Sequence, residues 1–289
     1  MKATFDCIPC LIRQAIETTR VSATDEQLRK QVINETLKHL QNVDVQHLSP
    51  PELGRQILDI IYRMTGNKDP YREIKFKLNT FFLEQYSNFK RLVYLNEDPV
   101  LLSAKLAVSG NILDFDSKNE MERIQIIIDK THKQQFTINH YSDFLNDLTH
   151  AKNVLYLTDN AGEIVFDKLF IEVLKRFYPE REHNFTVVVR GAPVINDATL
   201  EDARLINLHK VAAVIDNGDR APATILNYVS EKMKRYYDKA DLVISKGQGN
   251  FETLHEENKL IYFMLKVKCP VISSVLQVPE GSLIFKRSL

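Results

Sequence analysis

The first third of the chain carries apolar residues at helical spacing. From about residue 8 to residue 110 they recur every three or four positions. Leu53, Ile57, Ile60, Ile61 and Met64 illustrate the pattern. Ser49-Pro50-Pro51 is a suitable start for that helix, because proline is tolerated in the first turn, where backbone N–H groups have no helical partner. The pattern predicts a helical subdomain over residues 1–110.

Beyond Gly110 the pattern changes to short β-branched and aliphatic runs, which predict strands buried on both faces. These runs cover residues 124–128, 154–157, 185–189, 211–215, 242–244 and 271–272. Segments of helical length separate several of them, at residues 162–177 and 222–236. Alternating strands and helices predict an α/β domain over residues 111–289 with a parallel, doubly wound sheet. Residues 118–139 are expected to form an irregular connection, as a junction or a lid.

Composition narrows the class of partner. The 289 residues are 44% hydrophobic, enough for a substantial core, and 38 Lys and Arg balance 38 Asp and Glu. With no net positive field, nucleic acid and anionic membranes are not expected partners, and a small molecule is. The start lacks a signal-peptide core, no apolar run reaches membrane-spanning length, and three cysteines are too few for a disulfide framework. We expect a soluble, cytoplasmic protein.

The first polar segment of interest follows the run at residues 154–157. Asp159 and Asn160 are hard oxygen donors suited to Mg²⁺ or Mn²⁺, and Ala161 and Gly162 allow a ligand to approach the backbone. In a parallel sheet, ligands bind beyond the carboxyl ends of the strands. An isolated Asp-Asn pair more often caps the N-terminus of a helix, and both interpretations stay open at this point.

Two further strand ends carry polar residues. After residues 185–189, Arg190 and Gly191 lead through a proline-containing turn to Asp197, an oxygen donor that would share a metal with Asp159. After residues 242–244, Lys246 is followed by a flexible Gly247-Gln248-Gly249-Asn250 turn and Glu252. Such a loop can surround a phosphate while the lysine supplies a charge. A surface arginine, a second cap and a permissive turn are the alternative interpretations.

The other motifs in the sequence do not favour a different catalytic chemistry. Asp114-Phe115-Asp116 follows a poor strand and has Lys118 where an aspartyl-phosphate phosphatase has Thr or Val, and no Walker, HExxH or GxSxG motif occurs. Cys7-x-x-Cys10 is half of a zinc site or a redox pair. A second pair is absent and a helical region follows, so packing is favoured, with a supplementary metal or active-site lid role open.

The ordered set of motifs resembles the damage-control phosphatase family, also called DUF89 or ARMT1-like. The motifs are Cys7-Ile8-Pro9-Cys10, Gly66-Asn67-Lys68-Asp69-Pro70-Tyr71, Ser109-Gly110-Asn111-Ile112-Leu113-Asp114-Phe115, Thr158-Asp159-Asn160-Ala161-Gly162-Glu163, Arg190-Gly191-Ala192-Pro193 with Asn196-Asp197, and Ser245-Lys246-Gly247-Gln248-Gly249-Asn250. The cysteine pair and the last segment are similar to the prokaryotic branch. The eukaryotic branch has an Arg-Thr-x-Lys signature in the corresponding late region.

The resemblance implies a Rossmann-like three-layer α/β/α core with an N-terminal helical subdomain. It implies Asp159, Asn160 and Asp197 as ligands of a divalent cation, typically Mn²⁺, Mg²⁺, Co²⁺ or Ni²⁺. It places Lys246 and its neighbours in the substrate-phosphate region and a substrate loop near residues 216–220. On this basis we assign substrate binding to ten residues, namely Asn111, Arg190, Gly191, Asn217, Gly218, Lys246, Gly247, Gly249, Asn250 and Glu252.

The resulting hypothesis is metal-dependent hydrolysis of small phosphorylated metabolites, such as sugar phosphates, nucleotides or phosphorylated cofactors. The cation polarises the phosphoryl oxygens, and Lys246, with Arg190, stabilises their developing charge. The nucleophile is either metal-bound water or Asp159 or Asp197, and Glu163 and Glu252 are candidate bases. Two other functions remain as alternatives: carboxyl methylation with S-adenosylmethionine, and a non-enzymatic nucleotide-binding module. The oligomeric state is not predicted.

Overall fold

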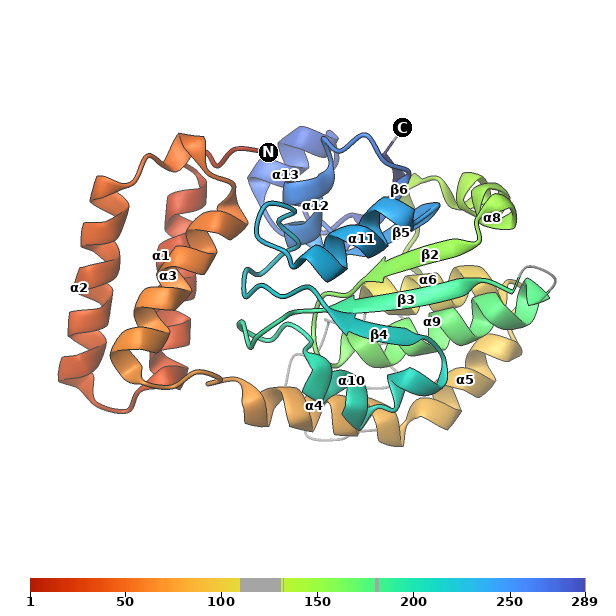
Figure 1. The fold of residues 1–289 in the computed structure, drawn as a ribbon, viewed down its shortest axis with the longest axis horizontal. Coiled ribbons are helices and arrows are strands. Elements are labelled where there is room, and N and C mark those ends of the chain that lie inside the picture. Colours follow the sequence, from red (N-terminus) through yellow and green to blue (C-terminus); the bar gives the residue numbers. More distant parts are fainter. Residues whose placement is uncertain (110–130, 132, 180–181, 289) are drawn as a thin grey trace.

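The computed structural model describes residues 1–109, 131, 133–179 and 182–288, and shows a sheet covered on both faces by helices (Figure 1). The strands are β1 (Phe136–Asn139), β2 (Asn153–Leu157), β3 (Asn184–Val189), β4 (Ala213–Asp216), β5 (Leu242–Lys246), β6 (Ile261–Lys266) and β7 (Leu283–Arg287). The helices up to β1 are α1 (Cys7–Ser22), α2 (Glu26–Asn42), η1 (Val45–His47), α3 (Pro50–Thr65), α4 (Arg72–Glu84), α5 (Tyr86–Tyr94) and α6 (Pro99–Ser109). The later helices are α8 (Tyr141–His150), α9 (Glu163–Phe177), α10 (Leu200–Leu205), η3 (Leu208–Lys210), α11 (Glu231–Lys239), α12 (Gln248–Leu254) and α13 (Pro270–Leu276).

The strand order β1-β7-β6-β5-β2-β3-β4 confirms a mostly parallel, doubly wound sheet. Every neighbouring pair is parallel except β6 and β7. The chain runs outward from β2 through β3 to β4, and then crosses back to place β5 on the other side of β2. The carboxyl ends of β2 and β5 therefore flank the point where the direction of winding reverses, the usual ligand crevice of such sheets.

Side-chain alternation along the central strands produces the three layers. In β2, Val154 and Tyr156 join a core cluster with helices α4, α5, α6, α8 and α9. Leu155 and Leu157, on the opposite face, pack with residues of α11, α12 and α13. Because successive strand side chains point to opposite faces, a continuous apolar strand must be covered on both sides. The expected α/β/α core is confirmed.

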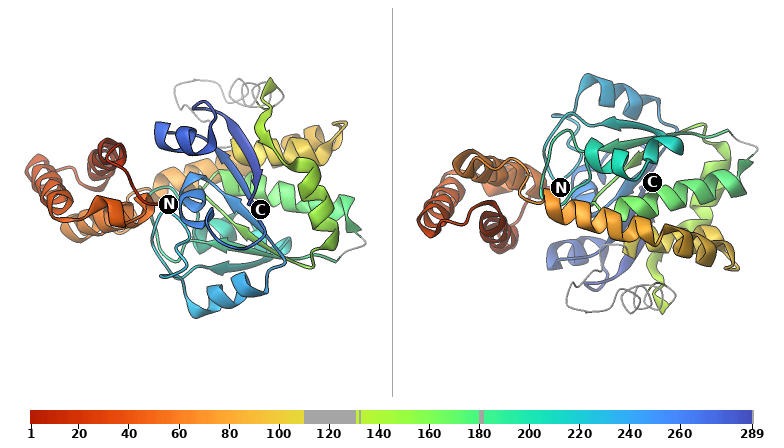
Figure 2. Two further views of the ribbon diagram at one scale, coloured as in Figure 1. Left: turned by 90° about the horizontal axis from the view of Figure 1, so that it is seen from above. Right: turned by 90° about the horizontal axis from the view of Figure 1, so that it is seen from below.

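Helices α1, α2 and α3 form a separate layer beyond the carboxyl ends of the central strands (Figures 1 and 2). They share their own core cluster, which includes Leu11, Val32, Leu53 and Ile57. The predicted start of α3 is confirmed, since Ser49 and Glu52 form a reciprocal capping box with proline in the first turn. By contrast α4, α5 and α6 pack into the core of the sheet. The domain boundary at residue 110 stays a prediction.

Several expected elements differ from the structure. Residues 271–272 are not a strand: Pro270 occupies the first turn of α13, where its missing N–H costs nothing. Residues 222–236 are helical only from Glu231, because the Ser230 side chain caps α11 by accepting from Met233 N. Residues 118–139 include β1, so the irregular connection is wrong at its end.

Other expectations hold or cannot be compared. The expected strands at 154–157, 185–189, 211–215 and 242–244 are confirmed as β2, β3, β4 and β5, with shifted ends. The expected strand at 124–128 lies outside the described residues, as does most of 118–139. Strands β6 and β7 were not expected. Among the residues that the structure describes, no helix combines the length and apolarity needed to cross a membrane.

Candidate metal and phosphate site

The loops after β2 and β3 pair with each other and bring the three expected metal ligands together. Asn160 and Asp197 form an isolated antiparallel bridge. Asp159 O accepts from Ala198 N at 2.9 Å, and the Asn160 amide donates to Asp159 Oδ2 at 2.8 Å. Asn160 and Asp197 are buried, whereas Asp159 is half-buried. Asp159, Asn160 and Asp197 thus form one cluster at the carboxyl edge of the sheet.

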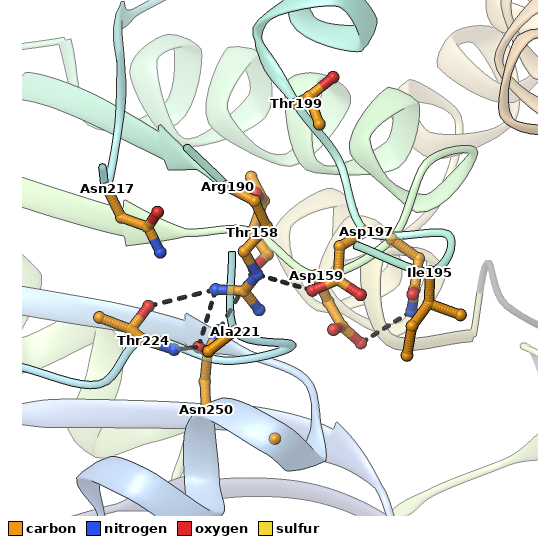
Figure 3. A network of polar contacts seen from close by, with 12 residues as sticks. Thr158, Asp159, Arg190, Ile195, Asp197, Thr199, Asn217, Ala221, Thr224 and Asn250 are labelled. Atoms are coloured by element: carbon orange, nitrogen blue, oxygen red, sulfur yellow. Dashed lines mark hydrogen bonds and ion pairs between the residues drawn. The ribbon is translucent and has the colours of Figure 1, made fainter. Parts of the chain in front are cut away.

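Arg190 lies beside Asp197 and holds its carboxylate by a hydrogen bond (Figure 3). Its Nε donates to Asp197 Oδ2 at 2.6 Å, and its Nη1 lies 3.3 Å from Thr224 Oγ1 and 3.2 Å from Asn250 Oδ1. The guanidinium is buried, and its Nη2 has no hydrogen-bond partner among the described residues. A charge-assisted bond of this length fixes the carboxylate. In this arrangement Arg190 holds Asp197 in position, and its predicted substrate contact stays a prediction.

Asp159 borders a cavity of about 260 Å³ at the reversal point of the sheet. The cavity is also lined by Glu163 at the start of α9, by Gly247 and Gln248 after β5, and by the end of β6 with Lys268. The Asp159 carboxylate lies directly against Gly247, where an added Cβ would stand 2.3 Å from the carboxyl carbon. Gly247 also has a φ of +85°, a conformation that disfavours any side chain. Glycine therefore makes room for the carboxylate.

Lys246 lies below this cavity, in a buried ion-pair network. Its Nζ donates to Ala107 O at 2.5 Å and to Asp167 Oδ1 at 2.8 Å, and lies 3.4 Å from Glu163 Oε2. Only 1% of the side chain is exposed. These three contacts match the three donors of an ammonium group. In this arrangement Lys246 supports Glu163, and its expected phosphate contact stays a prediction.

The electrostatics of the cluster suit a bound cation. Burial raises the pKa of Glu163 to about 8, with Lys246 opposing the rise and Asp159 adding to it. Burial raises the pKa of Asp197 to about 6, with Arg190 opposing and Asp159 adding. Asp159 therefore adds repulsion to an already acidic centre. Two carboxylates and an amide oxygen, all hard donors, fit a divalent cation that would neutralise this repulsion.

The donor set is small. Across residues 1–109, 133–179 and 182–288, no three His, Cys, Asp or Glu side chains converge as ligands. The predicted ligand set has only two carboxylates, those of Asp159 and Asp197, and its third ligand is the side-chain amide of Asn160. Such a set would leave coordination positions for water or phosphate oxygens.

Asn250 and Asn217, two of the other expected substrate contacts, are buried structural groups. Asn250 is fully buried and bonds Thr224 N, Arg190, Lys246 O and Thr158 O. Asn217 Oδ1 accepts from Gly191 N and Asp219 N, which joins the loop after β3 to the loop after β4. An added Cβ on Gly191 would stand 2.5 Å from the carbonyl carbon of Gly218. These residues hold the loops together at close range.

Gly249 and Glu252 also lie on the protein side of the loop. A Cβ on Gly249 would stand 2.4 Å from Pro222 O, so the glycine allows close packing. Glu252 Oε1 accepts from Gln248 at 2.8 Å, and burial raises the pKa of Glu252 to about 7. Unlike Glu163, Glu252 does not line the cavity. Asn111 lies outside the described residues. The substrate-binding roles of all these residues stay predictions.

Sequence reasoning missed Lys268, Gln248 and Asp167. Lys268 is an exposed residue whose charge lowers the pKa of three carboxyl groups, those of Glu163, Asp197 and Glu252. No ion pair involving Lys268 is present among the described residues, so its ammonium faces the cavity mouth uncommitted. The sequence signal that could have identified Lys268 is the apolar run of β6, which ends two residues before it.

We predict that Gly247→Ala reduces phosphatase activity about 10² fold, because its Cβ displaces the Asp159 carboxylate. The left-handed backbone adds a stability loss of about 1–3 kcal/mol. Gly281→Ala is the matched control, since Gly281 has the same φ of +85° and nothing within 4 Å of its added Cβ. The unfolding temperature should fall in both variants, whereas phosphatase activity should fall only in Gly247→Ala. Equal activity in the two would show that the Asp159 position is unimportant.

Comparison with known proteins shows the family to which the chain belongs. Residues 3–284 match the model of the damage-control phosphatase ARMT1-like domain. The chain is 33% identical to a damage-control phosphatase of Pyrococcus horikoshii, over 100% of this chain and 99% of that protein. It is 31% identical to a damage-control phosphatase of Archaeoglobus fulgidus, over 99% of each. The crystal structure of a DUF89 family protein from P. horikoshii superposes with a TM-score of 0.92 at 32% identity, covering both chains fully. The family resemblance is confirmed, and the chain belongs to the damage-control phosphatase family.

Proposed function

We propose that this phosphatase hydrolyses phosphomonoesters of small metabolites with a divalent cation, Mn²⁺, Mg²⁺, Co²⁺ or Ni²⁺, held by Asp159, Asn160 and Asp197. The observation that carries the proposal is the half-buried Asp159 carboxylate at the wall of the cavity where the sheet reverses. A helix cap alone would not need the carboxylate to face a cavity, and no side-chain cap bond is present at the start of α9. The capping interpretation of Asp159 is therefore not supported.

The residues around the cavity have different roles in the proposed reaction. When bound, the cation would polarise the phosphoryl oxygens and offset their charge. Lys268, at the cavity mouth, is placed to contact the phosphoryl group as an uncommitted cation. Glu163 lines the cavity and is the group placed to accept a proton from attacking water, whereas Glu252 lies outside it. Lys246 and Arg190 hold Glu163 and Asp197 in position.

Metal dependence is tested on the whole protein after removal of bound metal with a chelator. Phosphate release is measured against sugar phosphates, nucleotides and phosphorylated cofactors, with each of the four cations added singly. Thermal unfolding with each cation reports binding apart from catalysis, because a ligand of the native state raises stability. We expect activity and a raised unfolding temperature with the same cations. Metal-independent phosphate release, or none across the panel, contradicts the proposal.

Lys268→Ala is expected to raise KM for a phosphorylated substrate by about tenfold, since a partly exposed charge contact contributes roughly 1–2 kcal/mol. Lys268→Arg should retain most of the binding. Lys232→Ala is the control, because Lys232 is also exposed but lies on α11. The inhibition constant of inorganic phosphate reports on the same contact, because it measures phosphate binding apart from the chemical step. An unchanged inhibition constant in Lys268→Ala would remove Lys268 from the phosphate site.

A further inference from the structure

A buried side chain of α4 joins the two loops that carry the predicted metal ligands. Asn79 is fully buried, and both ends of its amide make hydrogen bonds. Its Oδ1 accepts from Gly162 N at 2.7 Å, and its Nδ2 donates to Asp202 Oδ1 at 2.8 Å. Gly162 ends the loop after β2, and Asp202 lies in the first turn of α10, which follows the loop of Asp197. One amide therefore connects the two loops.

Asp202 fixes its end of this bridge to the loop after β3. Its Oδ2 accepts from Thr199 N at 2.8 Å and from Thr199 Oγ1 at 2.7 Å. Thr199 stands two residues after Asp197 and pairs with Arg190 in an isolated bridge (Figure 3). Asn79 thus reaches the loop after β3 through a carboxylate that also holds the backbone of that loop.

The other end of the bridge lies at a close approach between α4 and the loop after β2. An added Cβ on Gly162 would stand 3.3 Å from Leu78 Cβ and 3.3 Å from the ring of Phe82, both in α4. N–H groups at the start of a helix have no partner within that helix. Gly162 is the N-cap of α9, and Asn79 supplies the partner of its N–H from a different helix. Helix α4 therefore holds the end of this loop.

The sequence motif at residues 66–71 supplies a charge partner for the bridge. Asp69 Oδ2, in this motif, lies 3.0 Å from Lys75 Nζ, which lies 3.8 Å from Asp202 Oδ2. Only 3% of the Lys75 side chain and 6% of that of Asp202 are exposed. A buried carboxylate costs stability unless it is paired and hydrogen-bonded. Lys75 supplies the positive charge that Asp202 needs, and Asp69 balances the remaining charge of Lys75.

We propose that Asn79 is a positioning residue, which fixes the loop after β2 relative to the loop after β3 and so sets the affinity of the predicted site for a divalent cation. It acts through Gly162 and Asp202 and touches neither cation nor substrate. Mg²⁺ needs ligand distances of about 2.0–2.1 Å, so a small shift of one loop lowers its affinity. The hydrogen bonds are independent of the proposed function, whereas their effect on cation binding rests on it.

The bridge needs an amide at residue 79 and a carboxylate at residue 202. An amide offers an acceptor to Gly162 N and a donor to Asp202 at the same time, which a carboxylate cannot do. Asn79→Asp sets two carboxylates against each other. The double variant Asn79→Asp, Asp202→Asn removes this conflict at unchanged net charge. Its new carboxylate accepts from Gly162 N and from the new amide, whose oxygen still accepts from Thr199.

The test measures the dissociation constant of Mn²⁺ for the full-length, metal-free protein by calorimetric titration, below the unfolding temperature of every variant. We expect Asn79→Asp to weaken Mn²⁺ binding about 10–100 fold, the effect typical of a residue that supports a metal ligand from behind. The double variant should bind Mn²⁺ within about threefold of the wild type, as expected for residues in one network. Phosphatase activity of Asn79→Asp should recover at saturating Mn²⁺.

Lys168→Met is the matched control for a purely structural effect. Lys168 in α9 is also buried, and its Nζ donates to Ile206 O at the end of α10 at 2.9 Å. It joins the same two helices as the bridge does, but through neither metal loop. Its loss should leave the Mn²⁺ dissociation constant unchanged.

A milder variant applies if Asn79→Asp does not fold. Thr199→Val keeps the shape of the side chain and removes only the hydroxyl donor to Asp202. It should weaken Mn²⁺ binding by about threefold, the value of one hydrogen bond. Hydrogen exchange of the peptide at residues 159–163 measures the bond to Gly162 without any metal. Exchange should be faster in Asn79→Asp and return to the wild-type rate in the double variant.

The outcomes separate this inference from the proposed function. If the wild type binds Mn²⁺ and folded Asn79→Asp binds it equally well, the residue is structural only and the inference fails. A double variant that binds Mn²⁺ as weakly as Asn79→Asp contradicts it too, because the restored hydrogen bonds would then not matter. If the wild type binds none of the four cations, the proposed function fails together with the positioning role, and hydrogen exchange still reports the bridge itself.

Discussion

Asp159→Asn is expected to lower kcat/KM for a phosphomonoester roughly 10³ fold, about 4 kcal/mol of transition-state stabilisation. The amide has the size of the carboxylate but lacks the charge that a divalent cation requires. Stability should not fall, because Asp159 raises the pKa of Glu163, Asp197 and Glu252, and its removal relieves that repulsion. Phosphate release and thermal unfolding, each with and without metal, separate the two effects.

Asp241→Asn is the matched control for this variant. Asp241 also lies at a strand end, directly before β5, and its Oδ2 accepts from Lys152 N and Asn153 N, but it does not line the cavity. It should retain activity and the metal-induced rise in unfolding temperature. If Asp159→Asn keeps both properties as well, the metal site is elsewhere.

Lys246→Met is expected to destabilise the fold by about 3–5 kcal/mol, because it leaves buried carboxyl groups without their cation. Asp167 is fully buried and Glu163 is 6% exposed, so water cannot replace the ammonium at either. Tyr156 OH would remain as a donor to Asp167 at 2.7 Å. Denaturant unfolding at neutral pH measures the loss, which should appear in the midpoint with an unchanged slope.

A second substitution distinguishes a lost ion pair from lost packing. Lys246→Met with Asp167→Asn removes the unpaired charge, and it should recover most of the stability, as expected for residues in one network. Lys175→Met is the control, since Lys175 also donates to a backbone carbonyl, Val211 O, but from an exposed position. It should change stability by less than about 0.5 kcal/mol. If Lys246→Met keeps normal stability but loses activity, the result would support the predicted contact between Lys246 and the substrate phosphate.

The fold was predictable as far as local patterns determine it. Runs such as Val154–Leu157 identify strands because apolar residues on both faces need cover on both sides. The Ser49 capping box and Pro50 identify the start of α3 for equally local reasons. The failures occurred where local signals conflict. Val271 and Ile272 favour a strand, but Pro270 and the packing of Ile272 against the sheet decide for α13.

The candidate site, like the fold, could be predicted only as far as local sequence patterns determine it. The order of motifs along the chain was sufficient to identify the family. It also singled out Asp159, Asn160 and Asp197, which the structure brings together, and their role as metal ligands stays a prediction. The direction of each side chain could not be predicted, because strand order and loop pairing decide it. Lys246 ends β5 and Lys268 follows β6, but one ammonium lies under the cavity against Asp167 and the other lies at its mouth. Short-range sequence patterns contain no information on that difference.

For Asp159, the sequence by itself determined the chemistry: a hard oxygen donor at a strand end, next to an amide. It did not determine whether the carboxylate would cap a helix or face a cavity. The tertiary structure decided this, because β5 returns beside β2 and sets Gly247 against the carboxylate. Contacts between distant segments depend on the packing of the whole core, which no local pattern encodes.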